Sequence, residues 1–237
     1  MARLDPRLLL QGYASGVFPM ADSRDAEDLF WVEPRQRAII PLDRFHFSTS
    51  LRKTVRSGEF DVTVDKDFQG VILACADRTE TWINADIERA MVALHRLGHA
   101  HSIEVRDAGA LVGGVYGVKL GRAFFGESMF SRRTDASKVA LAWLVARLKA
   151  GRFTLFDCQF MTGHLASLGA IEVPRDNYVA LLSEAVGDSS GGASSASESD
   201  VPPPDFFEID RLLDAAGAAG AGGPAGKLIA QLLVQTS

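Results

Sequence analysis

This sequence lacks the features that mark secreted, membrane-spanning and disulfide-bonded proteins. Its 237 residues include only two cysteines, Cys75 and Cys158, which are too few for a disulfide framework and fit a reducing compartment. No apolar run approaches the roughly 20 residues needed to cross a membrane, and residues 1–6 lack the apolar core of a signal peptide. We therefore expect a soluble, cytoplasmic protein.

Metal-binding motifs are missing as well. The histidines at positions 95, 99, 101 and 164 form no Cys/His pair with zinc-finger spacing, and no His-Glu-x-x-His sequence occurs. We interpret these histidines as ordinary core or surface residues. The sequence predicts no metal site.

An excess of basic charge, which supports broad nucleic-acid binding, is also absent, because the formal net charge is −5. Residues 188–237 hold seven acidic and two basic residues and account for all of this charge. One local basic stretch is a candidate for phosphate contacts, although an ordinary solvated face explains it equally well. It contains Arg35, Arg37, Arg44, Arg52, Lys53 and Arg56.

The composition that remains is that of a globular protein with a separate tail. Apolar residues make up 47% of the chain and charged residues 23%, so a sizeable core can form. From residue 187 the chain turns to Ser, Gly, Ala and Pro, which is typical of a linker. We predict a small N-terminal domain over 1–47, a main domain over 48–187, and an acidic low-complexity tail over 188–237. Within the tail, Lys227–Val234 is a candidate docking helix or strand.

Hydrophobic periodicity predicts an α+β main domain. Helix signals bound segments of about 6–15 and 86–97, and a strong helix begins at Thr134 or Asp135. Between these helices the apolar period changes to two, which predicts an antiparallel meander over 101–106, 111–120 and 122–125. A strand over 153–157, a short helix near 164–168 and a helix over 176–186 follow. The order of these elements favours an α+β, or α/β-like, fold.

Two short strings place polar groups where strands of this sheet end. Gly126-Glu127-Ser128-Met129-Phe130-Ser131 ends the meander, and Asp157-Cys158-Gln159 ends the next strand. Asp157 and Gln159 are two residues apart, so their side chains should share one face, and Cys158 should face away and be buried and inert. Taken alone, these residues are explained equally well as a functional site and as capping or structural hydrogen-bonding groups.

The two strings belong to a longer series that resembles the bacterial leucyl/phenylalanyl-tRNA–protein transferases over residues 5–185. The other members of the series are Gly16-Val17-Phe18-Pro19, Thr81-Trp82-Ile83, the segment from His99 to Val105, Asp135-Ala136-Ser137-Lys138 and Ser167-Leu168-Gly169-Ala170. The resemblance implies an acetyltransferase-like (GNAT-type) domain with a mixed, largely antiparallel sheet behind a small N-terminal domain. It also implies transfer of Leu or Phe from aminoacyl-tRNA to proteins that begin with Lys or Arg, which marks them for N-end-rule degradation.

The resemblance assigns roles to the polar residues. Asp157 and Gln159 match residues implicated in peptide-bond formation, and Glu127 and Ser128 match the region that meets the positively charged acceptor. Because the tRNA ester is already activated and an α-amine has a pKa of about 8, alignment alone supplies much of the catalysis. We therefore expect no covalent enzyme intermediate and no cofactor.

The resemblance also assigns the sites for the tRNA donor. The residues that match the pocket for the leucyl or phenylalanyl side chain are Met129, Leu141, Leu144 and Phe156, although core packing explains each of them individually. Trp82 is suited to stacking on the 3′-terminal adenosine, with core packing as the alternative. Met20 stands where many relatives have a second tryptophan, and it is expected to pack against a base.

Two other functions fit the residues less well. An acetyl-CoA-dependent N-acetyltransferase would need a Gly-rich turn at a helix N-terminus to hold the pyrophosphate. The matching segment, Arg132–Ser137, has no glycine, and its acid Asp135 would repel phosphate. An RNA-binding or adaptor module would leave Glu127, Asp157 and Gln159 unexplained. The predicted partners are thus Leu-tRNA or Phe-tRNA and acceptor proteins, with no membrane and no DNA.

Overall fold

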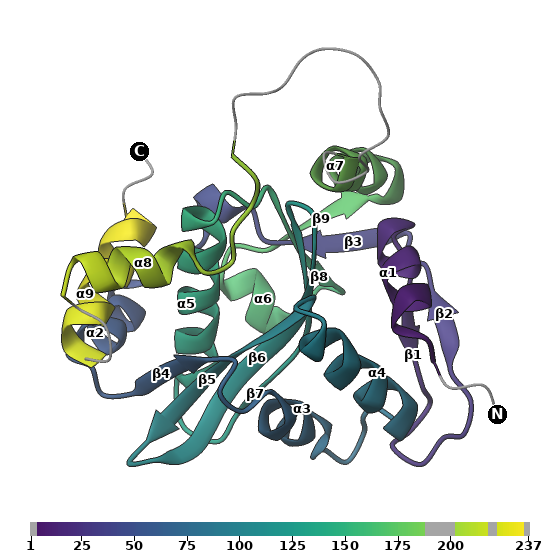
Figure 1. The fold of residues 1–237 in the computed structure, drawn as a ribbon, viewed down its shortest axis with the longest axis horizontal. Coiled ribbons are helices and arrows are strands. Elements are labelled where there is room, and N and C mark those ends of the chain that lie inside the picture. The colour runs from purple at the N-terminus through teal and green to yellow at the C-terminus, as the bar shows by residue number, and fades with distance from the viewer. Residues whose placement is uncertain (1–3, 188–201, 218–221, 235–237) are drawn as a thin grey trace.

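The computed structural model describes residues 4–187, 202–217 and 222–234, arranged around one seven-stranded sheet (Figure 1). The strand order is β4-β5-β6-β7-β8-β3-β9, and every neighbouring pair is antiparallel except β7–β8. The strands are β3 (Gln36–Ile39), β4 (Asp61–Val64), β5 (Ala100–Asp107), β6 (Ala110–Leu120), β7 (Ala123–Ser131), β8 (Leu155–Gln159) and β9 (Ile171–Pro174). The predicted α+β fold with a mixed, largely antiparallel sheet is confirmed.

Helices cover both faces of this sheet and form a hydrophobic core with each. On one face lie α2 (Thr49–Ser57), α5 (Ala136–Ala150), α6 (Gly163–Ser167), α8 (Glu208–Ala215) and α9 (Gly222–Val234). On the other lie α1 (Pro6–Ala14), α3 (Phe68–Ala76), α4 (Ala85–Arg96) and α7 (Arg175–Gly187). A 3-10 turn (η1, Leu42–Arg44) and a small antiparallel ribbon of β1 (Phe18–Met20) and β2 (Phe30–Val32) complete the described elements. None of the described helices is long and apolar enough to span a bilayer.

The helix ends follow from local chemistry, and the predicted helices are confirmed to within a few residues. The Asp5 carboxylate caps α1 by accepting from the Arg7 amide at 2.8 Å, and Pro6 occupies the first turn. The Asn84 side chain caps α4 in the same way. The strand predicted over 153–157 begins two residues later, and α2, α3, β4 and β9 were not predicted.

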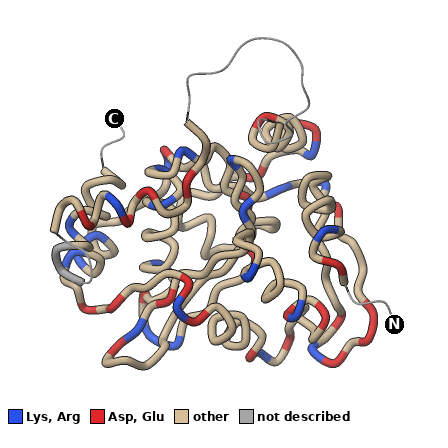
Figure 2. The backbone as a smooth tube through the Cα atoms, in the orientation of Figure 1, with Lys and Arg blue, Asp and Glu red and all other residues tan. Residues whose placement is uncertain are grey.

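The N-terminal region contributes to the main sheet. Strand β3 lies between β8 and β9, although it falls inside the predicted small domain over 1–47. The domain boundary after residue 47 stays a prediction. Lys and Arg positions and Asp and Glu positions are interspersed over the described part of the trace (Figure 2).

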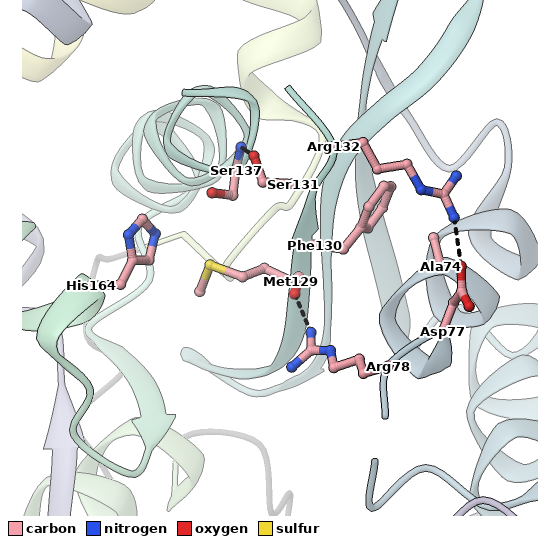
Figure 3. Close-up of a pocket in the computed structure, with 9 residues that line it drawn as sticks. All are labelled: Ala74, Asp77, Arg78, Met129, Phe130, Ser131, Arg132, Ser137 and His164. Atoms are coloured by element: carbon pink, nitrogen blue, oxygen red, sulfur yellow. Dashed lines mark hydrogen bonds and ion pairs between the residues drawn. The ribbon is translucent and has the colours of Figure 1, made fainter. Parts of the chain in front are cut away.

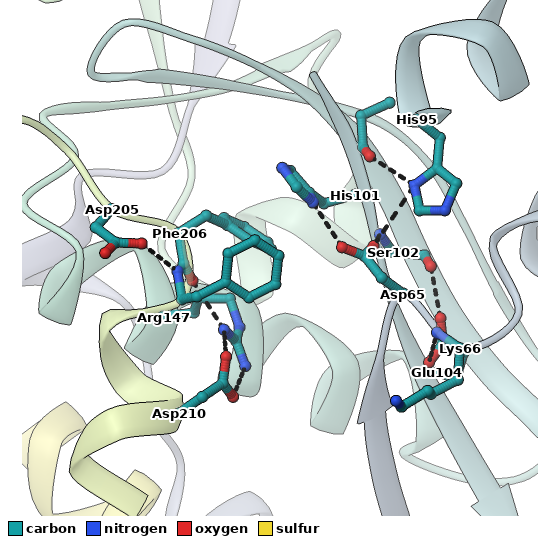
Figure 4. Close-up of polar contacts among 12 residues, drawn as sticks. Asp65, Lys66, His95, His101, Ser102, Glu104, Arg147, Asp205, Phe206 and Asp210 are labelled. Atoms are coloured by element: carbon teal, nitrogen blue, oxygen red, sulfur yellow. Dashed lines mark hydrogen bonds and ion pairs between the residues drawn. The ribbon is translucent and has the colours of Figure 1, made fainter. Parts of the chain in front are cut away.

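The described part of the predicted tail packs against the main domain. The candidate docking segment Lys227–Val234 lies in α9, which packs on α2 and α5. The segment before α8 is held in place because the Phe206 ring stacks on His101 at 4.1 Å, and α8 itself is held by the pairing of Arg147 with Asp210 (Figure 4). Most of the predicted linker lies outside the described residues.

Candidate functional site

The only parallel pair in the seven-stranded sheet opens a cavity between its strands. β7 and β8 pair from Ala123–Leu155 to Phe125–Asp157, and β7 then continues to Ser131 alongside β6 alone. A cavity of about 400 Å³ lies where the two strands diverge. Its walls come from β7, β8, α5 and the segment before α4, and its lining residues include Trp82, Glu127, Ser128, Met129, Leu141, Phe156, Cys158 and Gln159.

The structure brings most of the predicted site residues to this cavity. Two of them are buried behind its wall: Asp157 is 0% exposed and Leu144 is 1% exposed, and neither lines the cavity. Met20, in β1, is not among the lining residues either. The cavity therefore unites both strings with Trp82, while three of the predicted residues lie outside its lining.

A buried ion pair fixes the polar end of the site. The sequence placed Arg37 in a basic surface patch, but this is wrong, since the residue is 1% exposed. Its guanidinium instead holds Asp157 through Nε–Oδ1 at 2.9 Å and Nη2–Oδ2 at 2.6 Å. The guanidinium also lies between the rings of Phe18 and Tyr178, at 4.6 and 4.7 Å from their centroids. This paired geometry orients the carboxylate rigidly.

Asp157 in turn fixes the main chain of Gln159. The Gln159 amide donates to Oδ1 at 2.8 Å, and the Tyr178 hydroxyl donates to Oδ2 at 2.7 Å. Asp157 therefore contacts the main chain of Gln159 and not its side-chain amide, which donates to Glu127. Gln159 has φ of +64°, a conformation that costs a non-glycine residue free energy. The bond to Asp157 stabilises this turn, so Asp157 acts by positioning Gln159.

The turned side chain of Gln159 reaches the buried carboxyl of Glu127. Gln159 Nε2 donates to Glu127 Oε1 at 2.9 Å, and the Tyr13 hydroxyl interacts with the same carboxyl. Burial raises the pKa of Glu127 to about 8, and the Asp157 charge adds to the rise. Burial and the Glu127 charge also raise the pKa of Tyr13. A carboxyl at a cavity wall is suited to a cationic ligand.

Cys158 lies on the side away from Asp157, as predicted, but the cavity reaches that side. It is half-buried and lines the cavity on the same side as Phe156, two residues earlier. Burial raises the pKa of its thiol well above the ordinary value. A thiol in this state is a poor nucleophile, so the cysteine contributes a wall and not a reactive thiolate.

Sequence reasoning missed three residues that shape the site. Tyr13 and Tyr178 lie in helices far from both strings in the sequence, and only the fold brings them to Glu127 and Asp157. Arg78 lines the cavity and donates to Ser128 Oγ at 3.1 Å. No motif signals any of the three. In the described part of the chain, no group of three or more His, Cys, Asp or Glu residues is arranged to hold a metal ion.

Comparisons with known proteins match the chain to one family. The family model described as leucyl/phenylalanyl-tRNA protein transferase matches residues 39–183, and the model of that family's N-terminal domain matches residues 2–35. A leucyl/phenylalanyl-tRNA–protein transferase of Rhizorhabdus wittichii is 56% identical over the full length of both chains. One from Cereibacter sphaeroides is 66% identical over 77% of this chain and 86% of its own.

Among solved structures there is a remote similarity to one described as "The structure of L-PGS from Bacillus licheniformis". It has a TM-score of 0.38 and 13% identity, and it covers 70% of this chain and 56% of the other. The two family models and the full-length relative together decide the assignment. This chain belongs to the leucyl/phenylalanyl-tRNA–protein transferase family.

Proposed function

We propose that this aminoacyltransferase moves Leu or Phe from aminoacyl-tRNA to the N-terminal α-amine of proteins that begin with Lys or Arg. The modified proteins would be marked for N-end-rule degradation in the cytoplasm. The observation that carries the proposal is the Glu127–Gln159 pair at the wall of a largely apolar cavity. The apolar part suits a leucyl or phenylalanyl side chain, and the carboxyl suits a cationic acceptor.

Gln159 is the residue we assign to the attacking amine. Its Nε2 donates to Glu127 Oε1. Its carbonyl oxygen Oε1 can therefore accept a hydrogen bond from the amine, which directs the nitrogen lone pair toward the ester. The ester carbon gains the C–N bond and loses the bond to the ribose 3′ oxygen. The amine proton is released, and the departing oxygen takes up a proton. Alignment of this kind supplies several kcal/mol of the barrier.

The remaining walls of the cavity fit the donor. Met129, Leu141 and Phe156 form the apolar surface for the aminoacyl side chain, and methionine adapts to either of the two shapes. Trp82 is half-buried at the same cavity and offers its ring to the terminal adenine. Met20 and Leu144 stay predicted donor contacts that this cavity does not include.

The reaction is tested by following labelled leucine from leucyl-tRNA to a peptide with N-terminal arginine, beside a peptide with N-terminal glycine. We expect transfer to the arginine peptide only. The Gln159→Ala variant should lower kcat about 100-fold with a smaller change in KM, because it removes alignment of the amine. Thr154→Ala, exposed just before β8, is the control. Acetylation from acetyl-CoA without leucyl transfer would contradict the proposal.

The donor pocket is tested by two matched leucines of α5. Both Leu141 and Leu144 are buried, but only Leu141 lines the cavity. Each change to alanine should lower the free energy of unfolding by about 2–5 kcal/mol. Only Leu141→Ala should also shift the Phe-tRNA to Leu-tRNA ratio of kcat/KM, by about tenfold toward the larger side chain. An equal shift in Leu144→Ala would mean that the pocket extends deeper than the cavity described above.

A further inference from the structure

A second cavity, of about 450 Å³, adjoins the first one on the side toward α3 (Figure 3). The two cavities share Arg78, Met129 and His164. The other lining residues of the second cavity come from α3, from the end of β7 and from the first turn of α5. They are Ala74, Asp77, Phe130, Ser131, Arg132 and Ser137. None of these six has a role in the peptide-forming step.

The second cavity presents polar groups that have no partner of their own. Ser137 is 8% exposed, and its hydroxyl forms no hydrogen bond with the described residues, although its backbone amide donates to Ser131. The Nε2 atom of His164 is likewise buried and without a partner in the part of the chain that the structure describes. Figure 3 shows both side chains around the same opening as Arg78. A hydroxyl without a partner and a buried ring nitrogen at the wall of a cavity suit a polar ligand.

The charge of the second cavity favours an anion, because the acid expected to repel phosphate from this segment, Asp135, is paired with Lys138 at 2.9 Å and does not line the cavity. Two guanidinium groups line it, and the single acid in its described lining, Asp77, is already paired with Arg132 Nη2 at 3.1 Å. Arg78 donates hydrogen bonds only through Nη2, to Ser128 Oγ and to the Met129 carbonyl. The remaining N–H groups of both arginines are left to bind oxygen atoms. Guanidinium groups bind phosphate oxygens through two parallel hydrogen bonds, which suits them to nucleic-acid backbones.

We propose that the second cavity binds the phosphate on the 5′ side of the terminal adenosine of aminoacyl-tRNA. The inference rests on the proposed function, which places the 3′ ester of that adenosine in the first cavity. One ribose carries both the 3′ ester and the 5′ phosphate, so the phosphate must lie within one sugar of the reacting carbon. Arg78, shared by the two cavities, occupies the corresponding position between them. The phosphate contact would fix the register of the donor, as backbone contacts do in other nucleic-acid complexes.

Two minimal donors that differ by one phosphate test this site. We would compare 3′-O-leucyl-adenosine with 3′-O-leucyl-adenosine 5′-phosphate as donors to the arginine peptide. In the wild type, kcat/KM should be about tenfold higher for the phosphorylated donor, as expected for charge-assisted hydrogen bonds at a partly open site. Arg132→Ala and Ser137→Ala should each reduce this ratio toward one. A ratio taken within one variant is unaffected by any loss of folded protein.

Arg133→Ala is the matched control, because Arg133 neighbours Arg132 but pairs with Glu59 and Asp107 and does not line the cavity. It should keep the tenfold ratio. Equal use of the two donors by the wild type, or an unchanged ratio in the Arg132 and Ser137 variants, would overturn the phosphate site alone. Equal inhibition of both donors by inorganic phosphate would also overturn it. Failure of both donors and of leucyl-tRNA would instead overturn the proposed function.

Discussion

Replacing Arg37 with methionine is expected to lower the free energy of unfolding by about 3–5 kcal/mol, because it leaves the Asp157 carboxylate buried without its counter-charge. Neither side chain is more than 1% exposed. Such a loss is a large share of the roughly 5–15 kcal/mol that holds a typical domain folded. The measurement is urea unfolding at neutral pH. We also expect transfer activity to fall in the folded fraction, since Asp157 positions Gln159.

Two comparisons distinguish the free-energy cost of breaking this buried pair from the cost of removing an exposed charge. Arg175 and Glu33 form an ion pair in which both side chains are about half exposed, so Arg175→Ala should cost less than about 1 kcal/mol. The double variant Arg37→Met/Asp157→Asn should recover part of the loss, because asparagine removes the stranded charge and keeps an oxygen for the Gln159 amide. Equal losses for Arg37→Met and Arg175→Ala would show that burial of the pair does not matter.

The same pair shows what could and could not be predicted from the sequence. The strings at 126–131 and 157–159 pointed to the part of the sheet where the cavity lies, because polar residues at strand ends give a local signal. The sequence around Arg37 predicted an exposed residue, since the stretch is rich in arginine. Its burial depends on β3 entering the main sheet beside β8, a long-range pairing that no local pattern encodes. Helices α1 and α4 could be predicted because their capping residues are signals in the local sequence.

Cys158 marks a second limit of pattern reasoning. Alternation along a strand predicts that it faces away from Asp157, and it does lie on the side of Phe156. The cavity nevertheless reaches that side, because β7 and β8 separate beyond Phe125–Asp157 and Gln159 turns with a positive φ. Alternation describes a regular sheet, whereas this site is built where the sheet stops being regular. Departures from local rules are expected at functional sites.

Glu127→Gln is expected to stabilise the protein at pH 8 and to weaken its function. The pKa of Glu127 is about 8 in the folded protein, against an ordinary value of 4.5. The folded state therefore binds an extra proton between these values, so the contribution of Glu127 to stability is fully present below about pH 4.5 and is lost as pH rises through 8. Between pH 5 and pH 8 this loss is on the order of 3 kcal/mol. The glutamine variant cannot ionise and should not show it.

Urea unfolding at pH 5 and pH 8 measures this effect as a difference between the wild type and the variant. The advantage of Glu127→Gln should grow with pH. Glu172→Gln, which changes an exposed acid on β9, controls for the substitution itself. A constant difference between wild type and Glu127→Gln at both pH values would mean that the carboxyl is not held in a dry environment.

Glu127→Gln should also weaken acceptor binding, because the buried Glu127 carboxyl lies at the cavity wall with a raised pKa. A cationic acceptor beside this carboxyl would favour its ionised form. We therefore expect acceptor binding below pH 8 to release a proton, visible as a buffer-dependent binding enthalpy. Glu127→Gln should abolish this release and lower kcat/KM for an arginine peptide about 10- to 100-fold relative to one beginning with methionine. A retained preference for arginine would show that another residue recognises the cation. The destabilisation caused by burying the Glu127 carboxyl would then be unrelated to acceptor binding.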